Sequence, residues 1–162
     1  MKMRMSWVSM VYVLGLSLVV GVLVLTVPST ASEITATVDI NPETLNLNSS
    51  GTWITVYIEL SGYNVEDINV STVLLEEFVP AETNPKYGFV KNPEIKDRDG
   101  DGIPELMVKF DRQMVINYIW DRLCHMGIVP LSKEGGEVDL TITGELINGT
   151  SFEGSDTIRV IY

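Results

Sequence analysis

Three aspartates stand at alternate positions in the segment "DRDGDGIPE", where Asp97, Asp99 and Asp101 are followed directly by Gly102. Carboxylates spaced this closely repel one another unless a cation lies among them. In a calcium loop, positions one, three and five supply side-chain oxygens, a glycine at position six permits a sharp turn, and position seven supplies its backbone carbonyl. The spacing therefore predicts a Ca²⁺ site.

Position twelve of such a loop, which carries a bidentate glutamate in a helix-loop-helix hand, is Val108 here. Glu105 at position nine is the predicted replacement, and the segment that follows has the alternation of a strand. The loop is thus expected to close a β-hairpin, without the pair of helices that a calcium sensor opens. The predicted ligands are the side chains of Asp97, Asp99, Asp101 and Glu105 and the backbone carbonyl of Ile103.

Two other interpretations of the loop stay open. It can be a solvated acidic turn, in which the charges of Lys96 and Arg98 offset the repulsion between the aspartates. Magnesium suits the site less well than calcium, because Mg²⁺ demands near-ideal octahedral geometry and retains several waters.

The elements around the loop are predicted to be mostly strands. In Trp53–Leu60, apolar residues alternate with Trp53, Thr55, Tyr57 and Glu59, so that one face is core. About seven short strands with turn signals between them predict an all-β, two-sheet immunoglobulin-like β-sandwich, with a small barrel as the alternative. The predicted strands are Ile34–Ile40, a short piece near Leu45, Trp53–Leu60, Ile68–Leu75, Glu105–Phe110, Glu137–Leu146 and Ser151–Ile161.

Two local features complete this prediction. Asn148 and Gly149 between the last two strands favour a type I′ hairpin turn. Apolar residues at helical spacing in Asp111–Met126 predict one helix inserted before those strands, with Asp111 as a good N-cap residue.

The N-terminus is predicted to export the protein. Residues 7–27 form an uncharged, almost wholly apolar run of about the length that crosses a bilayer, and Lys2 and Arg4 precede it. The segment is either a signal peptide cleaved after Ala31 or a retained membrane anchor, a hydrophobic helix outside the globular part. The predicted organisation is therefore a targeting segment, 1–32, and an extracellular or cell-surface domain, 33–162.

The predicted domain is strongly acidic. All 22 acidic residues lie after residue 32 and only 9 of the 11 basic ones do, so residues 33–162 carry a formal net charge of −13. This charge argues against nucleic acid as a partner. The single cysteine, Cys124, excludes an intramolecular disulfide, which leaves a metal as the other common means of stiffening long loops.

Several motifs in order resemble a small secreted module of archaeal and bacterial surface proteins: "VDINPETLNLNSSGTWITVYIEL", "EDINVSTVLLEE", "DRDGDGIPELMVKFDRQ" and "GEVDLTITGELINGTSFEGSDTIRVI". The resemblance covers nearly all of residues 35–161. It implies a calcium-dependent β-sandwich to which no enzymatic activity is attached. This chain departs from the pattern in the longer insert "INYIWDRLCHMGIVPLSKEGG".

Other residues offer little for catalysis. Cys124 and His125 are sequence neighbours about 100° apart on a helix, which suits a core cysteine beside a surface histidine better than a nucleophile and its base. Glu76 and Glu77, as neighbours on a strand, point to opposite faces and make a poor carboxylate pair. Three sequons are acceptors if the host glycosylates exported proteins, and they begin at Asn48, Asn69 and Asn148.

The sequence thus predicts an exported, non-enzymatic module with structural calcium, acting in binding, adhesion or surface structure. Its expected partner is a protein or carbohydrate at the cell surface, and Trp53 and Tyr57 on an outward strand face are candidates for the contact. A membrane is expected to be contacted only through residues 7–27. The alternatives are a small secreted hydrolase or its accessory domain, and a subunit of a surface filament.

Overall fold

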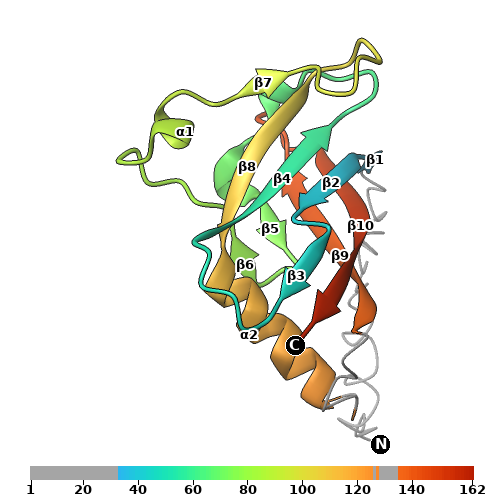
Figure 1. Ribbon diagram of the computed structural model, residues 1–162. Helices are drawn as coiled ribbons and strands as arrows, with labels where there is room; N and C mark the ends of the chain where they lie inside the picture. The colour runs from blue at the N-terminus through green and yellow to red at the C-terminus, as the bar shows by residue number, and fades with distance from the viewer. Residues whose placement is uncertain (1–32, 126, 128–134) are drawn as a thin grey trace, which may run out of the picture. The chain divides into compact units, whose positions relative to one another are not determined.

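Residues 33–125, 127 and 135–162 are described by the computed structural model, and they form two β-sheets that enclose a shared apolar core (Figure 1). The predicted all-β, two-sheet sandwich is confirmed. Every described residue belongs to one unit, and its core draws on residues from Ile34 to Val160. No helix among the described residues is long and apolar enough to cross a membrane. The predicted targeting segment, residues 1–32 with its apolar run 7–27, lies outside the described residues.

Sheet B carries the candidate metal loop. Its strands run in the order β2, β4, β8, β7, and every neighbouring pair is antiparallel. The predicted alternation holds in β4, whose apolar residues Ile54, Val56 and Ile58 are buried. The bounds are β2 (Thr37–Asn41), β4 (Trp53–Glu59), β7 (Ile95–Lys96) and β8 (Glu105–Asp111).

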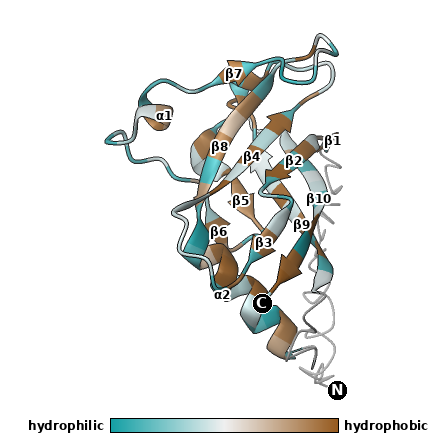
Figure 2. Cartoon of the chain, viewed as in Figure 1, coloured by the Kyte–Doolittle hydropathy of each residue, from teal (hydrophilic) through white to brown (hydrophobic). Residues whose placement is uncertain are grey.

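Sheet A has the order β1, β10, β9, β5, β6, and β3 also pairs with β10. Its centre is the long antiparallel hairpin of β9 and β10, along which polar outer residues alternate with buried ones (Figure 2). The bounds are β1 (Ile34–Thr35), β3 (Thr44–Asn46), β5 (Leu74–Leu75), β6 (Val79–Pro80), β9 (Gly136–Glu145) and β10 (Ser151–Ile161). The described residues thus form ten strands, and the prediction of about seven joined β1 to β2 and missed the two-residue strands β6 and β7.

The first predicted strand, Ile34–Ile40, divides between the two sheets. β1 pairs in parallel with β10, the chain then changes sheets at Ala36, and β2 pairs with β4. The Ala36 N–H donates to the Glu153 carbonyl at the crossing, at 2.8 Å. The chain returns to β10 as β3, so the two sheets are joined along this edge.

The predicted strand Ile68–Leu75 is wrong over most of its length. The 3₁₀ turn η2 (Val65–Asp67) immediately precedes it, a second 3₁₀ turn, η3 (Val70–Thr72), replaces its middle, and only its last two residues form a strand, β5. The side chains of Asn64 and Asn69 accept the N–H groups of Glu66 and Ser71 and so begin these turns. Asparagine offers the backbone such local bonds in competition with a strand ladder.

The type I′ turn predicted at Asn148 and Gly149 is also wrong. The Gly149 N–H donates to the Leu146 carbonyl, and within this turn Gly149 alone has a positive φ, +83°. A type I′ turn requires positive φ at both central residues. Two consecutive left-handed residues occur instead at Glu76 (φ 53°) and Glu77 (φ 62°), which therefore lie in the turn between β5 and β6 and not on a strand.

The predicted helix is present as α2 (Arg112–His125), and a second, four-residue helix is α1 (Gly88–Lys91). The Asp111 carboxylate accepts the Met114 N–H at 2.9 Å, as an N-cap does. Figure 1 shows α2 running along one end of the sandwich. The helix faces the core with its buried residues, Val115, Ile116, Ile119 and Leu123.

Candidate metal site

The three aspartates lie in the loop between β7 and β8. Ile95 pairs with Leu106 and Lys96 with Glu105, so the loop closes a β-hairpin. Such an arrangement has no helices on either side of the loop, as the strand alternation after Glu105 indicated.

Each aspartate of the loop accepts backbone N–H groups from residues further along it. Asp97 accepts from Gly100 at 2.7 Å and from Gly102 at 3.1 Å. Asp99 and Asp101 each accept, through Oδ1, from the residue two positions on, at 3.1 and 2.8 Å. These bonds leave the Oδ2 atoms of Asp99 and Asp101 without a hydrogen bond from the described residues.

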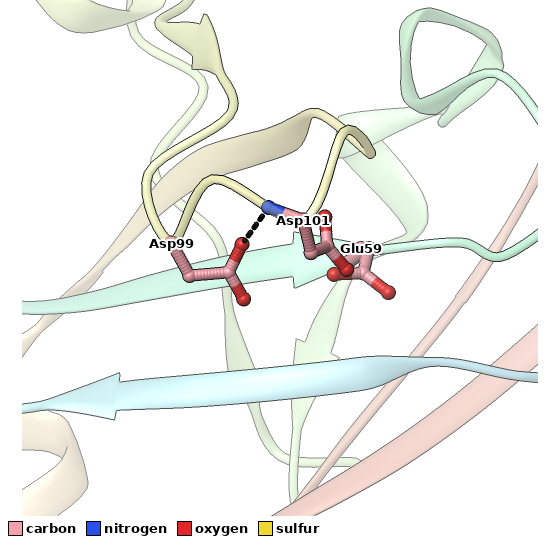
Figure 3. Close-up of side chains that lie close together, drawn as sticks. All are labelled: Glu59, Asp99 and Asp101. Carbon is pink, nitrogen blue, oxygen red and sulfur yellow. Dashed lines mark hydrogen bonds between the residues drawn. The ribbon is translucent and has the colours of Figure 1, made fainter.

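Glu59, at the end of β4, joins the loop and was missed by the sequence prediction. One carboxylate oxygen of each of Glu59, Asp99 and Asp101 lies within 4.8 Å of the other two (Figure 3). This is the one such group of three or more acidic, His or Cys side chains among the described residues. Glu59 stood in the sequence as an outward residue of a strand, and only its pairing opposite Glu105 brings it to the loop.

The Glu59 carboxylate is in an unfavourable electrostatic position. The residue is 8% exposed, and the hydrogen bond that it accepts from the Thr37 hydroxyl is long, at 3.3 Å. Burial raises the pKa of Glu59, and the nearby carboxylates of Asp101, Asp99 and Glu105 raise it further, against a smaller opposing effect of Thr37. A cation between these groups would remove both the repulsion and part of the desolvation cost.

The other predicted ligands lie outside the group of three. Both carboxylate oxygens of Asp97 accept backbone N–H groups of the loop. Glu105 is 8% exposed, and its Oε2 accepts the Arg98 N–H at 2.9 Å. Ile103 donates its N–H to Asp101. Two of the five predicted ligands, Asp99 and Asp101, thus lie in the group of three, together with Glu59.

Arg98 fixes the loop against the outer face of sheet B. Its guanidinium forms an ion pair with Asp39 on β2 at 3.0 Å and lies over the Tyr57 ring, 3.4 Å from the ring centroid. Arg98, which the sequence suggested as a counter-charge for the three aspartates of the loop, is therefore paired with Asp39 instead. A pocket of about 180 Å³ lies beside these residues and is lined also by Glu59, Asp99 and Glu105.

The residue types and spacing fit a hard divalent cation. Carboxylate oxygens are the ligands that Ca²⁺ and Mg²⁺ prefer. Two oxygens bound to one Ca²⁺ at about 2.3–2.6 Å can be no more than about 5 Å apart. The 4.8 Å separation within the group satisfies that limit.

Other residues singled out in the sequence lie elsewhere. Cys124 is exposed, so its prediction as a core residue is wrong. Trp53 is covered by Tyr87 and Phe89, with ring centroids 5.0 and 5.4 Å away, and Tyr57 by Arg98. These two aromatic residues therefore do not form an open contact patch. The three sequon asparagines, Asn48, Asn69 and Asn148, are exposed.

The chain matches no model of a protein family, and no curated protein or solved structure matches it either.

Proposed function

We propose that residues 33–162 form an exported, non-enzymatic module that is stabilised by calcium and acts in binding, adhesion or surface structure outside the cell. One observation supports the metal above all. Glu59 comes from a different strand than the loop, is almost fully buried, and has its carboxylate oxygen within 4.8 Å of those of Asp99 and Asp101.

The proposed ion is calcium. Glu59, Asp99 and Asp101 would hold it directly, and the Ile103 carbonyl, Asp97 and Glu105 are the further oxygens of the loop. Calcium accepts six to eight oxygen ligands in flexible geometry, which suits a loop that offers several carboxylates. When bound, the ion would supply positive charge that offsets the repulsion between these carboxylates.

The proposed role of the ion is structural. The loop closes the β7–β8 hairpin, Glu59 belongs to β4, and Arg98 links the loop to β2. An ion in the group of three would therefore tie the four strands of sheet B together at one end. Binding to the folded state alone stabilises a protein by mass action.

The proposed location rests on the sequence. Residues 7–27 have the composition of an export segment, and the acidic domain suits an outward compartment that is rich in calcium. The resemblance to modules of archaeal and bacterial surface proteins agrees with that location and with a non-enzymatic role.

Thermal unfolding of residues 33–162 tests the calcium site. The described core is built from residues of this range, so the domain is expected to fold without residues 1–32. After chelator treatment, Ca²⁺ should raise the melting temperature more than equimolar Mg²⁺, and the double variant Asp99→Asn, Asp101→Asn should lose that rise. Asp67→Asn is the control, an exposed aspartate that belongs neither to the loop nor to the group of three. No rise at about 10 mM Ca²⁺, above the weak end of extracellular sites, would contradict the proposal.

A further inference from the structure

The turn between β5 and β6 is held firmly against α2 and β9. Its central residues, Glu76 and Glu77, have positive φ, a conformation that non-glycine residues keep only where their surroundings hold them. The Glu76 carboxylate provides this hold, since it accepts the Thr141 N–H at 2.8 Å and the Tyr118 hydroxyl at 2.6 Å. Arg122 adds an ion pair to the same carboxylate at 3.3 Å. The residue that follows Glu77 is therefore fixed in position.

That residue, Phe78, presents an aromatic ring to solvent. It is 72% exposed, and it stacks on Tyr118 with ring centroids 5.7 Å apart and ring planes 28° from parallel. Tyr118 covers one face of the Phe78 ring, which leaves the other face open. A ring fixed in this way can contact a ligand with little loss of conformational entropy.

The Phe78 ring borders a groove of about 350 Å³ on the outer face of sheet A. Thr143 on β9 and Glu153 on β10 are directly paired, and both alternate with buried residues, so their side chains belong to this outer face. We name this the Phe78 groove, and its lining used here is Glu77, Phe78, Tyr118, Thr143 and Glu153.

The Phe78 groove is rich in hydrogen-bond acceptors that have no partner. The side chains of Glu77, Thr143 and Glu153 take part in no hydrogen bond or ion pair among the described residues. Arg122 is engaged by Glu76, which also lines the groove. An anionic ligand would therefore be repelled, and a ligand that binds must bring hydrogen-bond donors of its own.

Three classes of ligand fit the groove poorly. A peptide that adds a strand requires free backbone groups, but the N–H and the carbonyl of Thr141 are both bonded to Glu76, and the next residues of β9 pair with β5. A lipid would meet a mostly polar lining. A small amine would gain little, because Glu77 and Glu153 are exposed and ion pairs between exposed groups are weak.

We propose that the Phe78 groove binds a neutral glycan. The C–H groups on one face of a pyranose ring are partly positive, and they pack on the negative face of an aromatic ring such as that of Phe78. The hydroxyl groups around the sugar are donors, which Glu77, Thr143 and Glu153 can accept. The inference rests on the binding role proposed above, names its partner class and its site, and uses no residue of the calcium group.

An array of neutral, amino-bearing and acidic glycans, probed with labelled residues 33–162, tests the class of ligand. Neutral glycans should bind, and acidic ones should not, because the carboxylates of the groove repel them. Titration calorimetry with the neutral glycan that binds best then gives the affinity of each variant. Circular dichroism checks that every variant is folded.

Variants of the platform locate the site. Phe78→Ala should lower the affinity by about tenfold or more, and Phe78→Tyr should retain it, because the aromatic ring remains. Ile147→Ala is the matched control, since Ile147 is 75% exposed, lies outside the groove and loses a side chain of similar exposure. This control should bind as the wild type does.

Variants of the carboxylates separate hydrogen bonding from charge. Glu77→Gln with Glu153→Gln keeps an acceptor oxygen at each position, so the affinity for a neutral glycan should change by no more than about threefold. An amine would lose its two counter-charges in the same variant. Spermidine that binds the wild type more tightly than any neutral glycan, and fails to bind this variant, would assign the groove to organic cations and overturn the proposal.

Two further results would overturn it: no neutral glycan on the array binds the wild type, or binding persists undiminished in Phe78→Ala. Thermal unfolding with calcium and with chelator runs beside these tests. A rise in melting temperature with Ca²⁺ but no glycan binding would contradict this inference alone. Glycan binding without such a rise would contradict the calcium site alone.

Discussion

The Asp156 carboxylate on β10 accepts the Ile40 N–H on β2 at 2.8 Å, and this hydrogen bond joins the two sheets. Ile40 is fully buried, and its N–H lies on the edge of sheet B where the chain has crossed from one sheet to the other. The other Asp156 oxygen accepts the Thr157 N–H, also at 2.8 Å. A side chain therefore caps an edge of sheet B at which no further strand pairs within the described part of the chain.

Replacement of Asp156 by alanine should leave the buried Ile40 N–H without its acceptor. Such a loss lowers the free energy of unfolding by about 1–3 kcal/mol. Urea denaturation of the variant and the wild type measures this difference. Asp156→Asn should cost less, because its carbonyl oxygen can still accept one of the two N–H groups. Equal stability of the alanine variant and the wild type would show that water replaces this bond without penalty.

Glu59→Gln is expected to have opposite effects with and without calcium. In chelator at neutral pH the variant should melt at a higher temperature than the wild type, because it removes a buried charge that three other carboxylates oppose. In calcium the order should reverse, since the variant lacks one carboxylate of the group of three. A variant that melts below the wild type by the same margin in both conditions would indicate a packing role for Glu59 alone.

Tyr118 should make the stability of the domain dependent on alkaline pH. Burial, followed by its hydrogen bond to Glu76 at 2.6 Å, raises the pKa of Tyr118 above the ordinary value of 10.0. Because the folded state favours the protonated phenol, this contribution is complete below about pH 10 and is lost as the pH rises through the higher folded value. The difference in free energy of unfolding between the wild type and Tyr118→Phe should therefore shrink above pH 10. The exposed Tyr63 provides a control substitution of the same kind, Tyr63→Phe.

Gly154 allows the first strand to cross closely over β10. A Cβ atom at this position would lie 2.4 Å from the Ala36 carbonyl oxygen and 2.6 Å from Val38 Cγ2. Gly154→Ala should therefore cost about 1–3 kcal/mol of the free energy of unfolding through overpacking. Gly88→Ala is the matched control, because nothing lies within 4 Å of its added methyl group, and its effect should stay within about 0.5 kcal/mol. A tolerated alanine at position 154 would mean that the crossing can shift as a whole.

The sequence by itself determined the features that depend on neighbours in the chain. The alternation in Trp53–Leu60 and in the last two strands predicted buried faces, and the apolar spacing after Asp111 predicted α2. Aspartates at alternate positions predicted a tight acidic loop, whose internal hydrogen bonds run two to five residues along the chain. Local backbone geometry fixes all of these features.

The tertiary structure decided the features that depend on strand pairing. Glu59 meets Asp99 and Asp101 only because β4 pairs with β8 in a register that places it opposite Glu105. Ile40 meets Asp156, 116 residues away, only because the first strand changes sheets. The register between distant strands is set when the apolar faces of both sheets pack against each other. It therefore depends on many segments together and cannot be inferred from any short stretch of sequence.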